Sequence, residues 1–261
     1  MRSPLIEAAC VLQVSLDAAG RPGAENMAID AALLDRANDT GLSFLRLYRF
    51  DPPCLSLGRN EPAARYDYTE IARRGLDVVR RPTGGRAVWH EHEVTYAVAA
   101  PVAAFGSLRN AYHTIHERIA AALRSLGADA TLAPHQPPPS GRIDQAASCF
   151  ATTVGGEVLV AGRKLVGSAQ VRKGSAFLQH GSILLDGAQE VVAAVSRMPH
   201  LASAATTLSA ELGRHVTWDE VVEAVVQAWR DESNSPNLLQ PPPTSTTLHL
   251  DLAPLGIAVK S

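Results

Sequence analysis

The sequence predicts one large domain that contains both helices and β-strands. With 261 residues, 46% of them hydrophobic, the chain can bury a full core. Several stretches repeat apolar residues every three or four positions, as amphipathic helices do. Other stretches alternate apolar and polar residues between glycine-rich or proline-rich turns, as strands do.

In the first half of the chain, helices are expected over residues 25–38 and 68–74, and strands over residues 43–50 and 54–57. A glycine closes each helix, and a proline pair separates the two strands. The strongest helical pattern covers residues 107–126, where apolar residues recur at spacings of three and four and a glycine follows.

In the second half, strands are expected over residues 157–161, 165–171 and 177–185. Gly162 and Arg163 join the first two as a tight hairpin, so Lys164 lies at or just after the turn. Gln179, His180 and Gly181 are expected to interrupt the third strand, most simply as a hydrogen-bonded bulge.

Two more helices are expected at the end of the domain, over residues 188–198 and after a capping box that starts at Thr217. From Ser233 onward the composition becomes rich in proline, serine and threonine. We therefore predict a domain over residues 1–233 and a flexible tail over residues 234–261.

Charge and cysteine content exclude several classes of protein. The 24 basic and 26 acidic side chains give a formal net charge of −2, which argues against a nucleic-acid or lipid-surface binder. The first ten residues contain no signal-peptide core and no run approaches a membrane span, so we expect a cytoplasmic protein. Cys10, Cys54 and Cys149 form no C-x-x-C pair, which indicates free thiols, with Cys54 a buried small hydrophobe.

A glycine-rich turn at Pro82-Thr83-Gly84-Gly85 separates two β-rich runs. The simplest interpretation is a hairpin turn. Three cations, Arg80, Arg81 and Arg86, lie beside glycines whose backbone can approach a ligand, so the turn could also bind an anion. No G-K-[ST] follows, so it is not a Walker loop.

The run from His90 to Glu93 invites comparison with a metal site, but its spacing is unsuitable. In a strand His90 and His92 share one face while Glu91 points away, and helical H-E-x-x-H spacing is absent. His113 and His116 could pair on a helix, but no third ligand is near in sequence. We therefore expect no metal.

The stretch from Ser148 to Leu185 contains the candidate catalytic residues. It brings Cys149 within a hairpin's reach of Lys164, and a thiol near an ammonium suggests nucleophilic catalysis. Gly167, Ser168 and Ala169 are too small to fill a core and suit a position beneath a ligand.

These motifs resemble those of the superfamily of lipoate ligases, octanoyltransferases and biotin ligases. The resemblance rests on R-R-P-T-G-G-R-A-V-W-H-E at 80–91, on G-R-K-L-V-G-S-A-Q at 162–170 and L-Q-H-G-S-I-L-L at 178–185, and on an amino-terminal helix E-N-M-A-I-D-A-A-L at 25–33. It covers roughly residues 20 to 230. It implies an α+β fold, in which a central mixed, largely antiparallel sheet is flanked by helices as in class II synthetases and biotin ligases.

Within that superfamily, Ser148-Cys149-Phe150 before Lys164 is similar to the cysteine-dependent octanoyltransferases. The resemblance implies octanoyl transfer from octanoyl-acyl carrier protein to a lysine of a lipoyl domain, typically the glycine-cleavage H protein. Cys149 would form the acyl-enzyme and Lys164 would lower the pKa of that thiol. The sequence departs from the family at Ala151, where an acidic residue is usual, and over residues 152–156.

The other expected site residues surround these two. Backbone groups at Gly84-Gly85 or Gly167-Ser168 would stabilise the oxyanion, and Lys164, His90 or His180 would act as base in the second step. The full set of expected substrate-binding residues is Arg81, Gly84, Gly85, Arg86, Ala87, His90, Gly167, Ser168, Ala169 and His180.

Two other functions stay open from the sequence. One is an ATP-dependent lipoate-protein ligase, in which ATP, Mg²⁺ and lipoate give an adenylate held by Arg81, Gly84, Gly85 and Lys164. The other is a non-catalytic subunit that binds lipoyl proteins. The octanoyltransferase hypothesis requires no cofactor, and the resemblance favours a monomer.

Overall fold

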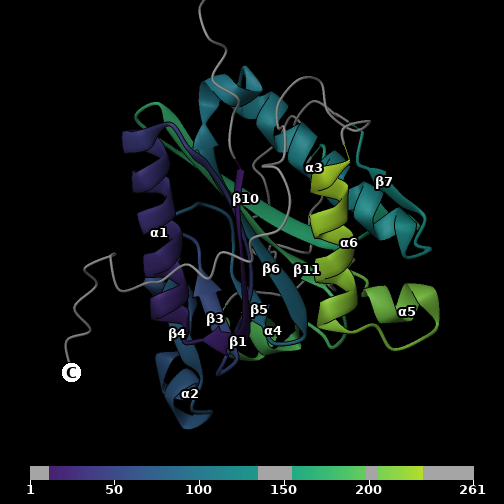
Figure 1. Ribbon diagram of the computed structural model, residues 1–261. Coiled ribbons are helices and arrows are strands. Elements are labelled where there is room, and N and C mark those ends of the chain that lie inside the picture. Colours follow the sequence, from purple (N-terminus) through teal and green to yellow (C-terminus); the bar gives the residue numbers. More distant parts are fainter. Residues whose placement is uncertain (1–11, 135–154, 198–204, 232–261) are drawn as a thin grey trace, which may run out of the picture.

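The computed structural model describes residues 12–134, 155–197 and 205–231, arranged around a five-stranded sheet of order β1-β2-β6-β11-β10 (Figure 1). Its strands are β1 (Leu12–Arg21), β2 (Ser43–Phe50), β6 (Glu93–Pro101), β10 (Val166–Lys173) and β11 (Ala176–Leu184). β1 and β2 are parallel, and the other neighbours are antiparallel. The predicted mixed, largely antiparallel sheet is therefore confirmed.

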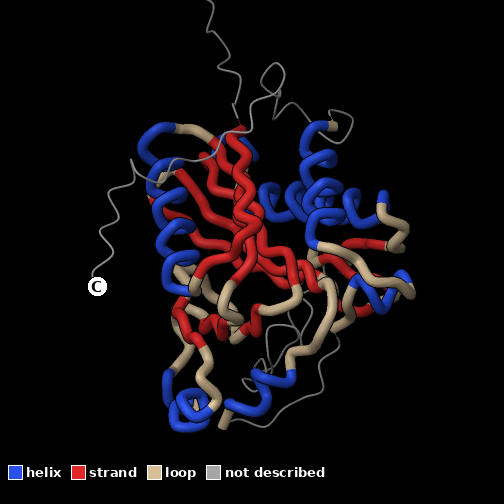
Figure 2. Tube along the Cα trace, turned by 60° about the horizontal axis from the view of Figure 1, so that its bottom comes forward, coloured by secondary structure: helices blue, strands red, loops and turns tan. Residues whose placement is uncertain are grey.

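Helices cover both faces of this sheet, as Figures 1 and 2 show. Helix α1 (Gly23–Thr40) packs on one face through residues such as Ile29 and Leu33. Helices α3 (Leu108–Ser125) and α6 (Trp218–Arg230) pack on the other face and share the larger core with it. The predicted capping box at Thr217 is present and opens α6.

A second sheet has β3 (Cys54–Leu57) between β4 (Asp77–Arg80) and β5 (Val88–His90). β4 is parallel to β3 and β5 is antiparallel to it. Residues 81–87 therefore cross from one side of β3 to the other, and the predicted hairpin turn is wrong. Two neighbouring β-rich runs cannot show by sequence alone that a third strand lies between them.

The small third sheet contains β7 (Ala130–Leu132), β8 (Val158–Val160) and β9 (Arg163–Lys164). The predicted hairpin between β8 and β9 is confirmed, since Leu159 pairs with Lys164 and Val160 with Arg163. Its turn is Ala161-Gly162 rather than the predicted Gly162-Arg163, because Arg163 is already paired in β9. Gly162 has a φ of 75° in that turn.

The predicted interruption of the third strand at 179–181 is wrong. β11 pairs residue by residue with both β10 and β6 through this segment, without a register shift. Gly181 has a packing reason instead, because a Cβ there would lie 2.5 Å from the Gly167 carbonyl oxygen and from Ser168 Oγ.

The remaining elements are short. They are η1 (Ala63–Arg65), α2 (Tyr68–Arg73), η2 (Val102–Phe105), α4 (Glu190–Val195) and α5 (Leu208–Leu212). α4 is shorter than the predicted helix over 188–198, and the predicted tail lies outside the described residues. In the described part of the chain, no helix is long and apolar enough to cross a membrane.

Candidate functional site

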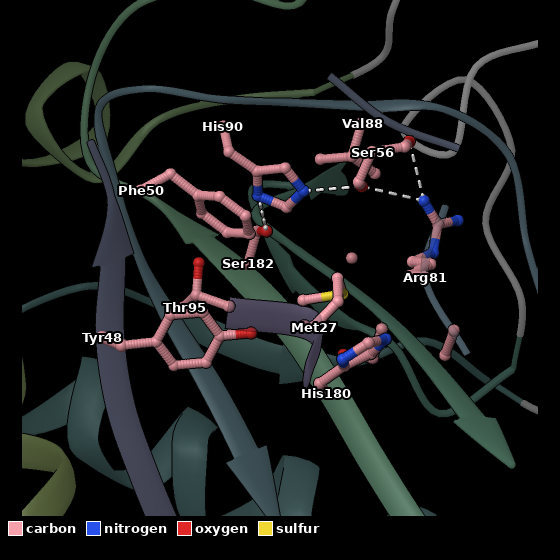
Figure 3. Close-up of a pocket in the computed structure, with 14 residues that line it drawn as sticks. Met27, Tyr48, Phe50, Ser56, Arg81, Val88, His90, Thr95, His180 and Ser182 are labelled. Carbon is pink, nitrogen blue, oxygen red and sulfur yellow. Dashed lines mark hydrogen bonds between the residues drawn. The ribbon is translucent and has the colours of Figure 1, made fainter. Parts of the chain in front are cut away.

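A pocket opens between α1, the carboxyl end of β2, the second sheet and the β10–β11 pair (Figure 3). It is lined by Met27, Tyr48, Phe50, Ser56, Arg81, Val88, His90, Thr95, Gly167, Ser168, Ala169, His180, Gly181 and Ser182. The cavity volume is about 30 Å³, room for roughly two water molecules. The pocket is therefore narrow in this structure.

His90 is held at the pocket by partners on both ring nitrogens. Its Nδ1 lies 2.5 Å from Glu93 Oε1, and its Nε2 lies 2.7 Å from Ser56 Oγ. A carboxylate only accepts, so Nδ1 carries a proton, and in the neutral ring Nε2 accepts from the Ser56 hydroxyl. Phe50 stacks on the His90 ring at 4.1 Å between centroids. These contacts hold the imidazole in one orientation, and Figure 3 shows its hydrogen bonds to Ser56 and Ser182.

His180 has the same arrangement with different partners. Its Nδ1 lies 2.8 Å from Asp30 Oδ2 of α1, and its Nε2 lies 2.6 Å from Thr83 Oγ1. Asp30 also accepts from the Tyr48 hydroxyl at 2.8 Å and from Arg46 at 3.2 Å. Both histidines therefore have Nε2 directed at a hydroxyl group.

Arg81 braces the segment we call the glycine loop, residues 81–86. Its guanidinium donates to the carbonyl oxygens of Ser56, Gly84 and Arg86 and to Ser56 Oγ. The residue is 5% exposed. Arg80 likewise donates to backbone carbonyl oxygens, of Gly58 and of the two residues 59 and 61. Much of the hydrogen-bonding capacity of Arg80 and Arg81, which was expected to hold an anion, is therefore directed at backbone carbonyl oxygens.

Lys164 lies in β9 and forms a buried ion pair. Its Nζ lies 2.6 Å from Glu157 Oε1, and each residue is 2% exposed. Among the described residues, those that line the pocket do not include Lys164. β9 pairs with β8, whose Val158 and Val160 share a core with residues of α3. The charge of Lys164 contributes to lowering the pKa of His116 in α3.

His116 joins the Lys164 side of the sheet to the pocket. Its Nδ1 lies 2.8 Å from the Gly156 carbonyl oxygen and its Nε2 lies 2.8 Å from Ser168 Oγ. Ser168 Oγ also lies 2.6 Å from the Tyr96 hydroxyl. Burial, opposed by the bond to Gly156 and reinforced by the charge of Lys164, lowers the pKa of His116 to about 3. His116 is thus neutral and accepts from Ser168.

Cys54 is buried, as expected from the sequence. Burial and the neighbouring Asp77 carboxylate raise the pKa of its thiol, which suits a structural role rather than a nucleophile. In the part of the chain that the structure describes, no three histidine, cysteine or acidic side chains come together as metal ligands.

The lipoyl protein ligase A/B catalytic domain matches residues 22–230 of this chain. The chain belongs to that family.

Three relatives of this chain are all named octanoyltransferase LipM. Octanoyltransferase LipM of Kyrpidia tusciae is 43% identical over 183 residues, covering 67% of this chain and 66% of that protein. LipM of Carboxydothermus hydrogenoformans is 42% identical and covers 62% and 61%, and LipM of Moorella thermoacetica is 39% identical and covers 78% and 80%. The match thus spans slightly less than two thirds of the first two relatives and more of the third.

Solved structures show the same fold. Lipoate-protein ligase A bound with ATP superposes with a TM-score of 0.69 at 19% identity, over 90% of this chain and 89% of that one. LipL1 of P. falciparum in complex with lipoate gives a TM-score of 0.65 at 19% identity, over 88% and 65%. The expected superfamily fold is therefore confirmed.

The family motifs meet at the pocket, although far apart in sequence. Six of the expected site residues line it: Arg81, His90, Gly167, Ser168, Ala169 and His180. Gly84, Gly85, Arg86 and Ala87 lie in and directly after the glycine loop. Cys149 lies outside the described residues, so its place relative to Lys164 stays a prediction.

Sequence reasoning missed the acidic and hydroxyl partners of the family's motif residues. Asp30, Glu93 and Glu157 each bind a histidine or the lysine, and Ser56 and Thr83 bind histidine Nε2 atoms. Asp30 is an acidic residue within an otherwise apolar helix pattern, and that pattern could have indicated a buried polar contact.

The run from His90 to Glu93 was expected to be one strand. It is not, because β5 ends at His90 and β6 begins at Glu93.

Proposed function

We propose that this protein transfers an octanoyl group from octanoyl-acyl carrier protein to the acceptor lysine of a lipoyl domain, with the glycine-cleavage H protein as acceptor. The observation that carries this proposal is a narrow, largely apolar pocket beside the family's glycine loop, in a chain whose relatives are octanoyltransferases. Cys149 is the proposed nucleophile, which forms a thioester with the octanoyl group.

The pocket suits an acyl chain because its polar groups bond to one another. Ser56, His90 and Arg81 are linked by hydrogen bonds, so an apolar chain passing them leaves no donor without a partner. An octanoyl chain needs more room than about 30 Å³, so the pocket must widen when it binds. Met27 lies in the middle of the close-up, and its unbranched side chain can move aside (Figure 3).

The reacting carbonyl is proposed to lie at the Gly167–Ser168 step of β10. Ser168 both lines the pocket and bonds to His116 on the Lys164 side, so this step joins the two halves of the site. β10 has a paired strand only on the β11 side within its five-stranded sheet, so alternate backbone N–H groups point away from β11. Such groups, or those of Gly84-Gly85, would donate to the oxyanion.

The second step needs a base, because an amine of pKa about 10.4 is protonated near neutral pH. His90 and His180 are poor direct acceptors here, since the Nε2 of each is occupied by a hydroxyl group. Lys164 is therefore the proposed base, once Cys149 is acylated and no longer negative. Glu157, at 2.6 Å, holds the Lys164 side chain in place.

The test is mass spectrometry of the full chain after mixing with octanoyl-carrier protein, without ATP. A mass increase of one octanoyl group on Cys149, absent from Cys149→Ala, is expected. No adduct would overturn the proposal. Lys164→Arg tests the base, since it should retain acylation and block transfer to the H protein.

The Cys149→Ala variant also distinguishes octanoyl transfer from the alternative function, an ATP-dependent lipoate ligase. An ATP-dependent lipoate ligase has no need of Cys149, so Cys149→Ala would then retain full activity with ATP and lipoate. The similarity to an ATP-bound ligase, at 19% identity, speaks for the fold alone. The carbonyl bonds of Arg81 favour an uncharged acyl group over a phosphate at the loop.

A further inference from the structure

Two buried chains of side chains end on the glycine loop. One runs from Glu93 through His90 and Ser56 to Arg81, which belongs to the loop. The other runs from Asp30 through His180 to Thr83. The second chain is the more direct, because Thr83 is itself in the loop, immediately before its two glycines.

Each hydrogen bond of this second chain has a defined direction. The Asp30 carboxylate accepts from Arg46 and from the Tyr48 hydroxyl, so it can only accept from His180 Nδ1–H. In the neutral ring His180 Nε2 is then the acceptor, and the Thr83 hydroxyl donates to it at 2.6 Å. Thr83 is 0% exposed, and its carbonyl oxygen accepts from the backbone N–H of Arg59 at 2.8 Å.

The glycines of the loop have no side chain that could anchor it, so apart from the Arg81 bonds to the carbonyl oxygens of Gly84 and Arg86 the loop depends on its neighbouring side chains. A Cβ placed on Gly84 would meet nothing within 4 Å, and Gly85 has a φ of 87°. Glycine gains more backbone freedom than any other residue when it is not held. Thr83 is the buried side chain next to them, and it connects the loop to α1 and β11, elements distant in sequence.

We propose that Asp30, His180 and Thr83 are positioning residues that hold the glycine loop in place at the pocket. Asp30 fixes the tautomer and the ring orientation of His180. His180 in turn fixes the Thr83 hydroxyl and, through it, the backbone of Gly84 and Gly85. The part of this inference that concerns catalysis rests on the proposed octanoyl transfer, whereas the part that concerns the loop does not.

The test compares Thr83→Val with Thr83→Ser in the full chain. Valine keeps the shape of threonine and removes the hydroxyl group, whereas serine keeps the hydroxyl group. Thr40→Val is the matched control, because the Thr40 hydroxyl donates to the Arg36 carbonyl oxygen at the exposed end of α1. Amide hydrogen exchange of Arg59 and Arg81, whose N–H groups donate to the carbonyl oxygens of Thr83 and Leu57, reports on the loop. The rate of Cys149 octanoylation reports on the site.

For Thr83→Val we expect exchange in the loop to become at least tenfold faster, and octanoylation at saturating donor to fall at least tenfold. Thr83→Ser should stay within threefold of the wild type in both, and Thr40→Val should change neither. Unchanged loop exchange in Thr83→Val, or equal effects of serine and valine, would overturn the proposal. If Thr83→Val does not fold, Thr83→Cys, a weak donor, takes its place with the same criteria.

The two readouts separate this inference from the proposed function. A wild-type protein that forms no octanoyl adduct would overturn the function, while faster loop exchange in Thr83→Val would still support the positioning role. Normal octanoylation in the wild type together with unchanged loop exchange in Thr83→Val would retain the function and overturn the positioning role.

Discussion

The buried ion pair of Lys164 and Glu157 allows a prediction of stability from geometry alone. The two charged groups lie 2.6 Å apart and each residue is 2% exposed. Removing one partner of such a pair leaves the other charge buried, which costs about 3–5 kcal/mol. Lys164→Met should cost this much, and Glu157→Gln should cost about 3 kcal/mol, because glutamine still accepts a hydrogen bond from the ammonium.

The double variant should be far more stable than the sum of the single effects. With both charges gone, no uncompensated ion remains, and buried pairs are often replaced by neutral groups at little net cost. We expect the double variant to lose about 1–3 kcal/mol, against about 6 kcal/mol or more for the summed single variants. The coupling energy should therefore be about 3 kcal/mol or more.

The assay is urea unfolding of the four proteins at pH about 7.5, with equal m-values required. Lys173 and Asp35 provide a matched control pair, since their groups lie 2.5 Å apart but their side chains are 58% and 51% exposed. The cycle Lys173→Met with Asp35→Asn should give a coupling of at most about 1 kcal/mol. A coupling for Lys164 and Glu157 no larger than that of the control would refute the reasoning.

Three further predictions follow from single side chains. Met27→Ala should widen the pocket and raise the rate with decanoyl relative to octanoyl donors several-fold in a competition assay; an unchanged ratio would remove Met27 from the chain-length limit. Because burial holds the pKa of His116 near 3 against about 6.5 when unfolded, the unfolded state binds more protons between these values and stability falls as pH falls, by at most about 1.4 kcal/mol per pH unit. His116→Gln should therefore lose less stability than the wild type between pH 7.5 and 5 in urea titrations, and equal losses would contradict this. Thr217→Ala should cost about 1 kcal/mol by removing the capping box of α6, while a thermal midpoint like that of the wild type would show that the cap contributes nothing.

Local patterns predicted the elements well because their causes are local. The alternation over 43–50 and the apolar spacing over 107–126 depend on residues within one element, and both elements lie where expected. The hairpin between β8 and β9 was also predictable, since a two-residue turn with glycine specifies its own pairing.

Pairing between distant strands and contacts between side chains were not predictable in this way. The glycine loop looked like a hairpin because nothing in residues 77–90 records that β3 inserts between its flanking strands. Gly181 looked like a strand interruption, whereas its cause is the close approach of Gly167 and Ser168 on the neighbouring strand. The partners of His90 and His180 come from α1, β3, the glycine loop and β6, so only the folded chain shows them together.

The motif residues make different contacts in the structure from those that the sequence led us to expect. Arg81 was expected to bind an anion. Its guanidinium instead donates to the carbonyl oxygens of Ser56, Gly84 and Arg86. His90 and His180 were candidate bases, but each is fixed between a buried carboxylate and a hydroxyl group. Polar groups that are already paired gain little from a polar ligand, which is consistent with the proposed acyl chain in the pocket. The proposed function therefore assigns the base to Lys164, which lies 2.6 Å from Glu157, and Ser168 links the pocket to His116.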